Sequence, residues 1–446
     1  MKTSFVEVAD QVAREIAAGS LAPGERLPPQ REFAHRRGIA SSTASRAYAE
    51  LARRGLVIGE VGRGTFVRAA PAPSFPALIE PSSAQVDLEL IFPMLPAHEG
   101  ALASALAELA GSPDFALALR PIGAAGNEPA RETVASFLAR PGWAPKPRSI
   151  LFAGNGRQAL AGALAALANP GDRIGVEAMT YPVIKGLAAK LGLTLIPLEM
   201  DQQGLIPDSL IAAHRRTPLA AVYLQPSLHS PSGATMGLLR RAAIGETLRS
   251  LTLTAIEDGV YSFLAEGDLP LAALASERVI FIESLSKRVA PGLSLGLLSA
   301  SDGLVSRLAS ALRSGAWSAA GLPMAAGCQW MKDGTARKMA ADKRADARLR
   351  RAVAQEILGD LGVTGDPRAY HAWLPLPEPW RAEAFAASAL RYGVAVTPGD
   401  AFAAIPGHAP AGVRLALASP PLPVLKQALE TLRRLAIGEI EGAAVE

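Results

Sequence analysis

A lysine that follows an apolar run has the most distinctive chemistry in this sequence. The run is followed by Ser284, Ser286 and then Lys287. A second apolar run ends with Asp258, 29 residues before this lysine, and Tyr261 stands three residues further on. A lysine amine forms imines with carbonyl compounds, a carboxylate pairs with a protonated ring nitrogen, and a tyrosine hydroxyl binds a phenolic oxygen. Pyridoxal 5'-phosphate requires these groups from a protein.

The elements that must position these side chains are predicted to form a mostly parallel sheet. Apolar strands alternate with Ala- and Leu-rich helices up to about residue 300, which is typical of α/β folds. In open α/β sheets, ligands bind beyond the carboxyl ends of the strands. Chemically matched groups follow five expected strands: Gly156, Arg157 and Gln158 after 149–153, Tyr181 after 173–176, a loop over 226–233 after 220–224, and Asp258 and Lys287 after two more.

The phosphate of such a cofactor would be bound at two of these strand ends. Gly156, Arg157 and Gln158 open a helix, and backbone amides at a helix N-terminus favour a phosphate. Ser284 and Ser286 add hydroxyl donors. Gly-rich turns between a strand and a helix are common, so this loop alone is a weak signal.

The remaining roles have plainer alternatives. Tyr181 would stack on the pyridine ring, although it also fits a core position. Lys287 could be a solvated surface lysine, and Asp258 could cap a helix while also binding a ring nitrogen.

The first 68 residues have a different character. Helices are expected over residues 5–18, 30–37 and 41–54, and two short strands over 56–58 and 65–67 flank a glycine-rich loop. This order predicts a winged helix-turn-helix. The chain has 45 basic and 41 acidic residues, and the first 68 residues hold eleven and seven of these, so the whole excess of four lies there. Such an excess suits contact with nucleic-acid phosphates.

This N-terminal segment resembles the GntR superfamily. The resemblance rests on Pro23-Gly24-Glu25-Arg26-Leu27-Pro28, Arg31-Glu32, Thr43, Ala47-Tyr48, Leu51, Gly55-Leu56 and Gly62-x-Gly64-Thr65-Phe66-Val67. It implies binding of double-stranded operator DNA. The residues implied to contact DNA are Arg31, the recognition-helix residues Ser41, Ser42, Thr43, Ser45 and Arg46, and Arg63 on the wing. Relatives often have Arg where Ser41 stands, so no base preference is implied. A helical interaction module with a basic face is the alternative.

Residues 86–440 resemble fold-type-I pyridoxal phosphate enzymes of the aspartate aminotransferase class, and nearly the whole chain resembles the MocR branch of GntR regulators. The matching pieces are Gly154-x-Gly156-Arg157-Gln158-Ala159-Leu160, Tyr181-Pro182, 226–233, 257–263, 284–296 and Val413-Arg414-Leu415. The implied fold is α/β, with a winged helix-turn-helix over 1–68, a Pro/Ala-rich linker over 69–85 and an aminotransferase-like domain over 86–446. A smaller C-terminal α+β part is expected at about 330–440.

The same resemblance assigns further roles. Lys287 would be the catalytic lysine and would hold the cofactor as an aldimine. Arg414 matches the residue that binds a substrate carboxylate, and Ser230 and His229 would touch the effector. A head-to-tail homodimer is also implied.

Three positions depart from the family pattern. Ser294 stands where an Arg usually binds the phosphate, and Ser230 stands near the position of an Asn in aminotransferases. Residues 121–126 lack the tyrosine that relatives often supply from the partner subunit. Weaker cofactor binding is expected unless Arg157 or Arg288 replaces the missing Arg. Full transaminase activity is not expected.

We therefore predict a transcriptional regulator that depends on pyridoxal 5'-phosphate and senses an amino compound or the cofactor itself. An aminotransferase with a DNA-binding appendage and a regulator that has lost the cofactor are the alternatives. The sequence has one cysteine, Cys328, no signal-peptide pattern and no run of 18 apolar residues, so a cytoplasmic location without membrane contact is expected. Its six histidines lack metal-ligand spacing.

Overall fold

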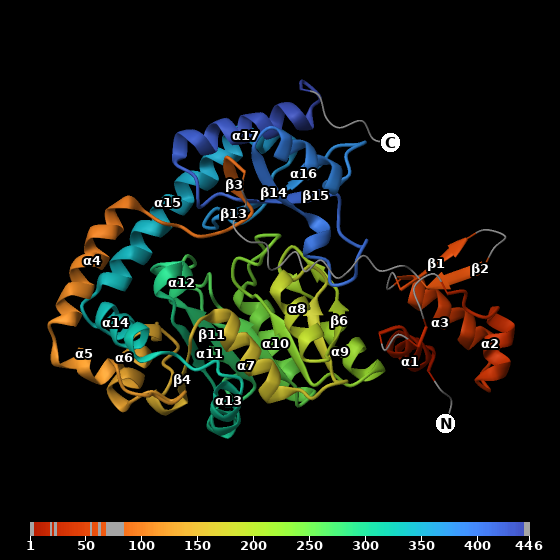
Figure 1. Ribbon diagram of the computed structural model, residues 1–446, viewed down its shortest axis with the longest axis horizontal. Coiled ribbons are helices and arrows are strands. Elements are labelled where there is room, and N and C mark those ends of the chain that lie inside the picture. Colours follow the sequence, from red (N-terminus) through yellow and green to blue (C-terminus); the bar gives the residue numbers. More distant parts are fainter. Residues whose placement is uncertain are drawn as a thin grey trace. The chain divides into compact units, whose positions relative to one another are not determined.

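The computed structural model describes residues 4–17, 20–21, 25–53, 56–60, 64–67 and 84–440. The chain divides near residue 76 into an N-terminal unit and a large unit, which are described separately (Figure 1). Residues 69–83 of the linker expected over 69–85, the turn at Pro23-Gly24 and the wing residue Arg63 lie outside the described residues.

The N-terminal unit has the predicted order of three helices and two strands. They are α1 (Phe5–Ala17), α2 (Gln30–Arg36), α3 (Ser41–Arg53), β1 (Val57–Glu60) and β2 (Gly64–Val67). The two strands pair antiparallel, with Val57 opposite Val67. Phe33 and Tyr48 meet edge to face with their ring centroids 5.1 Å apart. The Tyr48 hydroxyl donates to the Pro28 carbonyl at 2.6 Å, so the buried phenol keeps a hydrogen-bond partner. The unit is the predicted winged helix-turn-helix.

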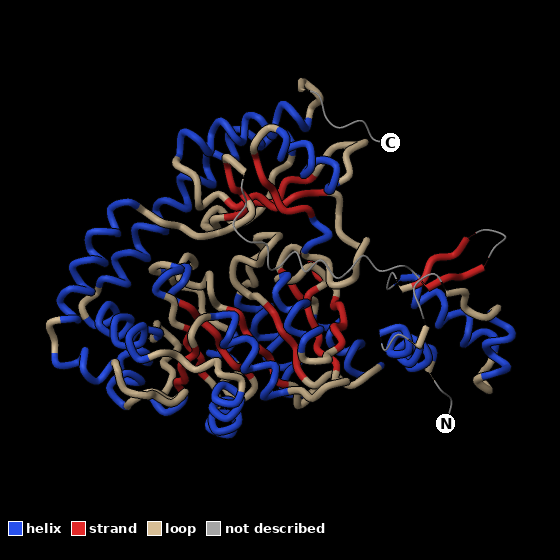
Figure 2. Tube along the Cα trace, viewed as in Figure 1, coloured by secondary structure: helices blue, strands red, loops and turns tan. Residues whose placement is uncertain are grey.

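A seven-stranded sheet forms the centre of the large unit (Figure 2). Its strand order is β4-β12-β11-β10-β9-β5-β6, and β12 is antiparallel to both of its neighbours while the other pairs are parallel. The strands are β4 (Ile150–Ala153), β5 (Arg173–Glu177), β6 (Thr194–Leu198), β9 (Ala221–Leu224), β10 (Thr254–Asp258), β11 (Val279–Ser284) and β12 (Gly296–Ser299). The predicted mostly parallel α/β sheet is confirmed.

Helices cover both faces of this sheet because its strand residues alternate between two apolar cores. Phe281 belongs to one core and Ile282 to the other, as Leu297 and Leu298 do on the next strand. One face carries α7 (Gly156–Leu167), α8 (Pro182–Lys190) and α13 (Asp302–Ser314). The other carries α4 (Pro96–Ala110), α6 (Glu128–Leu138), α9 (Pro207–Arg216), α10 (Leu238–Ser250), α11 (Leu271–Leu274) and α14 (Gly321–Lys332).

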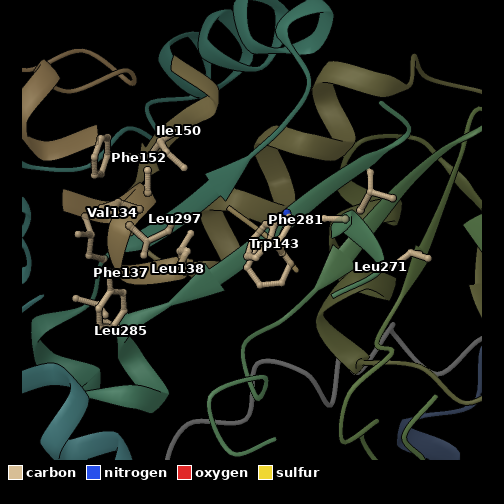
Figure 3. Packing of buried hydrophobic residues seen from close by; sticks show 14 of the residues in the cluster. Val134, Phe137, Leu138, Trp143, Ile150, Phe152, Leu271, Phe281, Leu285 and Leu297 are labelled. Atoms are coloured by element: carbon tan, nitrogen blue, oxygen red, sulfur yellow. The ribbon is translucent and has the colours of Figure 1, made fainter. Parts of the chain in front are cut away.

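Aromatic side chains pack in the core that lies under α4, α6 and α14. Trp143 and Phe281 meet edge to face, with their ring centroids 5.1 Å apart (Figure 3). Val134, Phe137 and Leu285 belong to the same buried cluster. The segment after β11, which carries Lys287, therefore starts from a well-packed base.

A second sheet forms the small part of the large unit. Its order is β13-β15-β14-β3, from β13 (His371–Pro375), β15 (Gly412–Ala416), β14 (Val394–Pro398) and β3 (Val86–Leu88). The helices beside it are α15 (Thr335–Leu358), α16 (Ala382–Arg391) and α17 (Leu422–Ala436). The edge strand β3 comes from residues far upstream, so this part is not the continuous stretch that the sequence suggested.

Short elements complete the large unit. They are α5 (Pro113–Ala118), α12 (Leu285–Arg288), the strand pair β7 (Met200–Asp201) and β8 (Gly204–Leu205), and single 3-10 turns at Pro147–Ser149, Pro291–Leu293, Gly359–Leu361 and Gly399–Ala401. Among the described residues, no helix is both long and apolar enough to cross a bilayer.

Candidate functional site

Lys287 and Asp258 lie at the same edge of the central sheet. The strands β10 and β11 are parallel neighbours, with Asp258 opposite Ile282. After β11 the chain makes the short helix α12, in which the Ser284 hydroxyl accepts from the Ser286 amide at 3.2 Å. Because the strands run parallel, both residues emerge at the carboxyl ends where ligands bind in such sheets.

The environment of Lys287 favours a neutral amine. Burial lowers its pKa well below the usual range, and the positive charges of Arg157 and Arg414 lower it further, against an opposite effect of Asp258. The charges of Arg157, Arg414 and Asp258, with a smaller effect of Lys343, therefore all act on this one lysine. A neutral lysine amine is the nucleophilic form.

A chain segment upstream of the sheet lies over Lys287. The lysine Nζ donates to the Ile91 carbonyl at 2.5 Å and lies 3.7 Å from the centroid of the Phe92 ring. Residues 89–92, which we call the covering segment, follow directly after β3. Nothing in the spacing of these residues predicted this contact.

Asp258 is a buried acceptor that is held in place by donors from β9 and the residue after it. Tyr223 donates to Asp258 Oδ2 at 2.6 Å and Gln225 Nε2 donates to the same oxygen at 3.0 Å. The Val260 amide donates to Oδ1 at 3.2 Å. Burial raises the pKa of Asp258, and these donors oppose that shift. The carboxylate thus has the backbone bond expected of a cap, and three donors fix its two oxygens.

The start of α7 lies against the end of β11. A Cβ at Gly156 would sit 3.2 Å from Ser284 Cβ, so this glycine allows the close approach of the two elements. Asn155 Oδ1 caps the helix by accepting from the Gln158 amide at 2.9 Å. That amide is therefore already bonded, whereas the cap leaves the Gly156 and Arg157 amides facing the helix N-terminus.

The two candidate tyrosines follow β5 and β10, which are separated in the sheet by β9. Tyr181 precedes α8, and its hydroxyl accepts from Arg157 Nε at 3.3 Å. Tyr261 is buried, and its ring lies against His371 with centroids 5.6 Å apart. Burial raises the pKa of both phenols, so both are protonated donors at neutral pH.

Arg414 lies on β15 and points to the same site from the small part. It donates to Thr397 Oγ1 at 3.0 Å and to the Glu89 carbonyl, and its guanidinium lies 5.0 Å from the Phe402 ring centroid. Its Nε is buried and has no hydrogen-bond partner among the described residues. A buried guanidinium with spare donors suits a ligand carboxylate.

The loop over 226–233 is fastened from inside. His229 is fully buried, with Nδ1 2.9 Å from Ser232 Oγ and Nε2 3.3 Å from Glu177 Oε2. The Ser230 amide donates to Gln225 Oε1 at 3.1 Å, while Ser230 Oγ is buried without a partner in the described structure. His229 thus braces the loop, and Ser230 keeps a hydroxyl available to a ligand.

These residues fit pyridoxal phosphate. A low-pKa amine, a carboxylate fixed by two side-chain donors and protonated phenols meet at one sheet edge. Two buried polar atoms, Ser230 Oγ and Arg414 Nε, still need partners, and buried polar groups normally have them.

Sequence reasoning missed three groups that support this site. Tyr223 and Gln225 fix Asp258 from β9 and the residue after it. Lys343 on α15 is fully buried and donates to the carbonyls of Lys287 at 3.0 Å and Val289 at 2.7 Å. Tyr223 and Gln225 lie at a strand end and could have been found there, whereas no local pattern marks Lys343.

The recognition helix of the N-terminal unit has one buried and one exposed side. Ala44, Ala47 and Tyr48 are buried, whereas the predicted contact residues Ser41, Ser42, Ser45 and Arg46 are exposed and Thr43 is half-buried. Ser41 is the first residue of α3. Arg31 on α2 is exposed, and the Arg46 guanidinium lies 4.1 Å from the Phe5 ring centroid.

Comparison with known proteins identifies the large unit. Residues 117–432 match the family model "Aminotransferase class I and II". The chain belongs to this family. Residues 5–67 match the model "Bacterial regulatory proteins, gntR family". Together the matches confirm the predicted MocR-type combination, and they confirm pyridoxal 5'-phosphate as the predicted cofactor.

Several individual proteins are similar to this chain. An HTH-type transcriptional regulator of Bacillus subtilis, YdeF, is 34% identical over 298 residues, covering 66% of this chain and 64% of the relative. The vitamin B6 salvage pathway transcriptional repressor PtsJ of Salmonella typhimurium is 25% identical and covers 93% of this chain and 94% of the relative. A kynurenine aminotransferase structure from Pyrococcus horikoshii superposes with a TM-score of 0.74 at 23% identity, covering 84% and 96% of the two chains, which shows the shared fold.

Lys343 yields a prediction about pH. Burial lowers the pKa of Lys343 to about 7, so between about pH 7 and pH 10 the unfolded chain binds a proton that the folded chain does not. The free energy of unfolding should therefore rise with pH in this window, by up to about 1.4 kcal/mol per pH unit. In Lys343→Met this contribution to the slope should disappear.

Denaturant unfolding followed by tryptophan fluorescence would measure this slope. All five tryptophans lie in the large unit, so the signal reports that unit alone. Lys332→Met, at an exposed lysine of α14, is the control and should keep the wild-type slope. Equal slopes in wild type and Lys343→Met would contradict the assignment.

Proposed function

We propose that this protein is a transcriptional regulator that binds operator DNA through α3 and senses pyridoxal phosphate or an amino compound through Lys287. The observation that carries the proposal is the convergence of Lys287, Asp258 and Arg414 on one site in a chain that also has a winged helix-turn-helix. A DNA reader and an amine-reactive site on one polypeptide are what a ligand-controlled regulator needs.

Each residue of the site has a defined task in this proposal. When bound, pyridoxal phosphate supplies a carbonyl group that reacts with amines and a ring that withdraws electrons. Lys287 would provide the neutral amine that bonds to the cofactor, and Asp258 would hold a protonated ring nitrogen. Tyr261 and Ser230 would donate to the phenolic oxygen, and Tyr181 would lie against the ring.

The covering segment would link the site to the DNA-binding unit. Its Ile91 carbonyl accepts a hydrogen bond from Lys287, and its Glu89 carbonyl accepts one from Arg414. An effector whose carboxylate binds Arg414, in a site where Lys287 holds the cofactor, must displace both carbonyls. Because these residues follow the Pro-rich stretch that leads from the N-terminal unit, their displacement would change how that stretch is anchored. A ligand can shift such an equilibrium only through different affinities for the two arrangements.

A head-to-tail homodimer forms part of the proposal. Leu117 and Leu119, in and just after α5, are 57% and 67% exposed, and Leu322 on α14 is 41% exposed. The helices α5 and α14 contact each other, so these leucines belong to neighbouring elements. Exposed apolar side chains that gather in this way suit a subunit interface.

An aminotransferase with a DNA-binding appendage is the rival function. Ser230 and Ser294 stand against it, because each replaces a larger polar side chain of the aminotransferase pattern. Turnover of an amino donor and a keto acid at ordinary enzymatic rates, from about 1 to 1,000 per second, would favour the enzyme.

The DNA-binding role predicts an effect of Arg31→Ala on salt dependence. If Arg31 contacts a phosphate, its loss should weaken binding to duplex DNA of any sequence and reduce the slope of log affinity against log salt by about 1. Fluorescence anisotropy at several salt concentrations would measure this. Arg120→Ala, at an exposed arginine of the large unit, should leave the slope unchanged. A wild-type slope in Arg31→Ala would remove Arg31 from the interface.

The sensing role predicts that Lys287→Ala separates DNA binding from ligand response. The variant should lose the cofactor-dependent visible absorption and the effect of amines on DNA affinity, because no amine remains to bond to the cofactor. Its affinity for DNA without ligand should match the wild type. Absorption spectra and band-shift titrations would test this, with Lys190→Ala, at an exposed lysine of α8, as the control. Unchanged amine response in Lys287→Ala would refute the proposal.

The covering segment predicts a gain of affinity in Phe92→Ala. The Phe92 ring lies over the Lys287 amine, with its centroid 3.7 Å from Nζ, and must move aside before that amine can bond to the cofactor. Its removal should therefore tighten pyridoxal phosphate binding, as measured by absorption titration. Met94→Ala, at an exposed residue two positions further on, should bind like the wild type. Weaker binding in Phe92→Ala would mean that the ring belongs to the ligand site itself.

A further inference from the structure

Three serine hydroxyls form a connected cluster where β11 ends. Ser284 Oγ lies 2.9 Å from Ser286 Oγ, and Ser286 Oγ shares a hydrogen bond with Ser294 Oγ. Ser294 is half-buried just before β12, and Gly156 at the start of α7 lies against Ser284. The cluster thus combines hydroxyl donors with the N-terminus of a twelve-residue helix, but it carries no charge of its own.

Arg288, which is close to this cluster in the sequence, is bound to another side chain. Arg288 pairs with Glu283 at 2.7 Å, and both side chains are buried. Its guanidinium lies 4.7 Å from the Phe137 ring centroid and 5.4 Å from that of Phe263. Breaking a buried ion pair leaves an uncompensated charge and costs about 3 to 5 kcal/mol, so Arg288 does not turn toward a phosphate.

Arg157 lies at the start of α7, near the serine cluster, but few contacts hold its side chain. It is exposed at the start of α7, and its Nε donates to the Tyr181 hydroxyl. An exposed guanidinium is partly screened by water and salt, so a bond from Arg157 to a phosphate is worth less than one from a buried arginine. The phosphate end of the site therefore depends mainly on neutral donors.

We propose that Ser294 sets the affinity of this site for phosphate, and that the uncharged cluster makes pyridoxal phosphate a reversibly bound effector instead of a permanently held cofactor. The inference rests on the function proposed above, in which the large unit binds this vitamer. A neutral hydrogen bond in place of a charge-assisted one weakens binding by about 10- to 100-fold. Occupancy then follows the free concentration of the vitamer, as a sensor requires.

A gain-of-affinity variant tests the proposal in the full-length chain. Ser294→Arg places a guanidinium at the half-buried position of the cluster. Pyridoxal phosphate and pyridoxal, which lacks the phosphate, are titrated separately, and absorption reports both dissociation constants. We expect Ser294→Arg to tighten pyridoxal phosphate binding by about 10- to 100-fold and to leave pyridoxal binding unchanged. Wild-type protein should lose pyridoxal phosphate on dialysis, and Ser294→Arg should retain it.

The control adds the same charge at the opposite edge of the sheet. Ser250 is exposed at the end of α10, the helix that leads into the amino end of β10, so Ser250→Arg should not change either dissociation constant. Ser294→Lys repeats the test if the arginine variant does not fold.

The outcomes separate the inference from the function on which it rests. An unchanged preference for the phosphorylated vitamer in folded Ser294→Arg and Ser294→Lys would overturn the inference, as would wild-type protein that keeps pyridoxal phosphate through dialysis. Absence of any vitamer binding to the wild type would instead overturn the proposed function.

Discussion

The site depends on the pairing of β10 with β11. Because these strands are parallel neighbours, Asp258 and the short helix α12 that carries Lys287 emerge at the same edge. The burial that lowers the pKa of the Lys287 amine would also make an isolated carboxylate costly. Tyr223 and Gln225 offset that cost by donating to Asp258. Amine and carboxylate can therefore remain close without neutralising each other through a direct ion pair.

The adjacent acidic residues Glu257 and Asp258 on β10 have different roles. Glu257 faces the opposite side of the sheet from Asp258, where it accepts from the Leu271 and Ala272 amides at 2.9 Å each and lies 3.7 Å from Arg241. One carboxylate thus fixes a helix start within the core, and the other is left for a ligand. The dipeptide Glu257-Asp258 alone does not show which carboxylate faces the core and which faces the site, until the two faces of the strand are known.

Local patterns in the sequence predicted the parallel sheet and the residues at its strand ends, because both follow from alternation and turn chemistry over short distances. They did not predict that β3 would pair with β14, since Val86 and Val394 are far apart in sequence and a three-residue strand has no periodicity of its own. For the same reason the covering segment and Lys343 escaped detection. Contacts between distant segments depend on tertiary packing, which no single window of sequence contains.

The covering segment is attached to the small sheet through the edge strand β3. Its backbone is held by β14 over only three residue pairs, Val86 with Val394, Ala395 with Asp87 and Leu88 with Val396, while Lys287 and Arg414 hold the residues that follow. A ligand that removes the second set of bonds leaves the β3 pairing, the bond from Ser419 Oγ to the Leu90 carbonyl and the buried Leu88 and Ile91 side chains to hold the segment. Local opening of such a short segment costs less free energy than global unfolding. A weakly held effector can operate such a device, because the change it must drive is equally small.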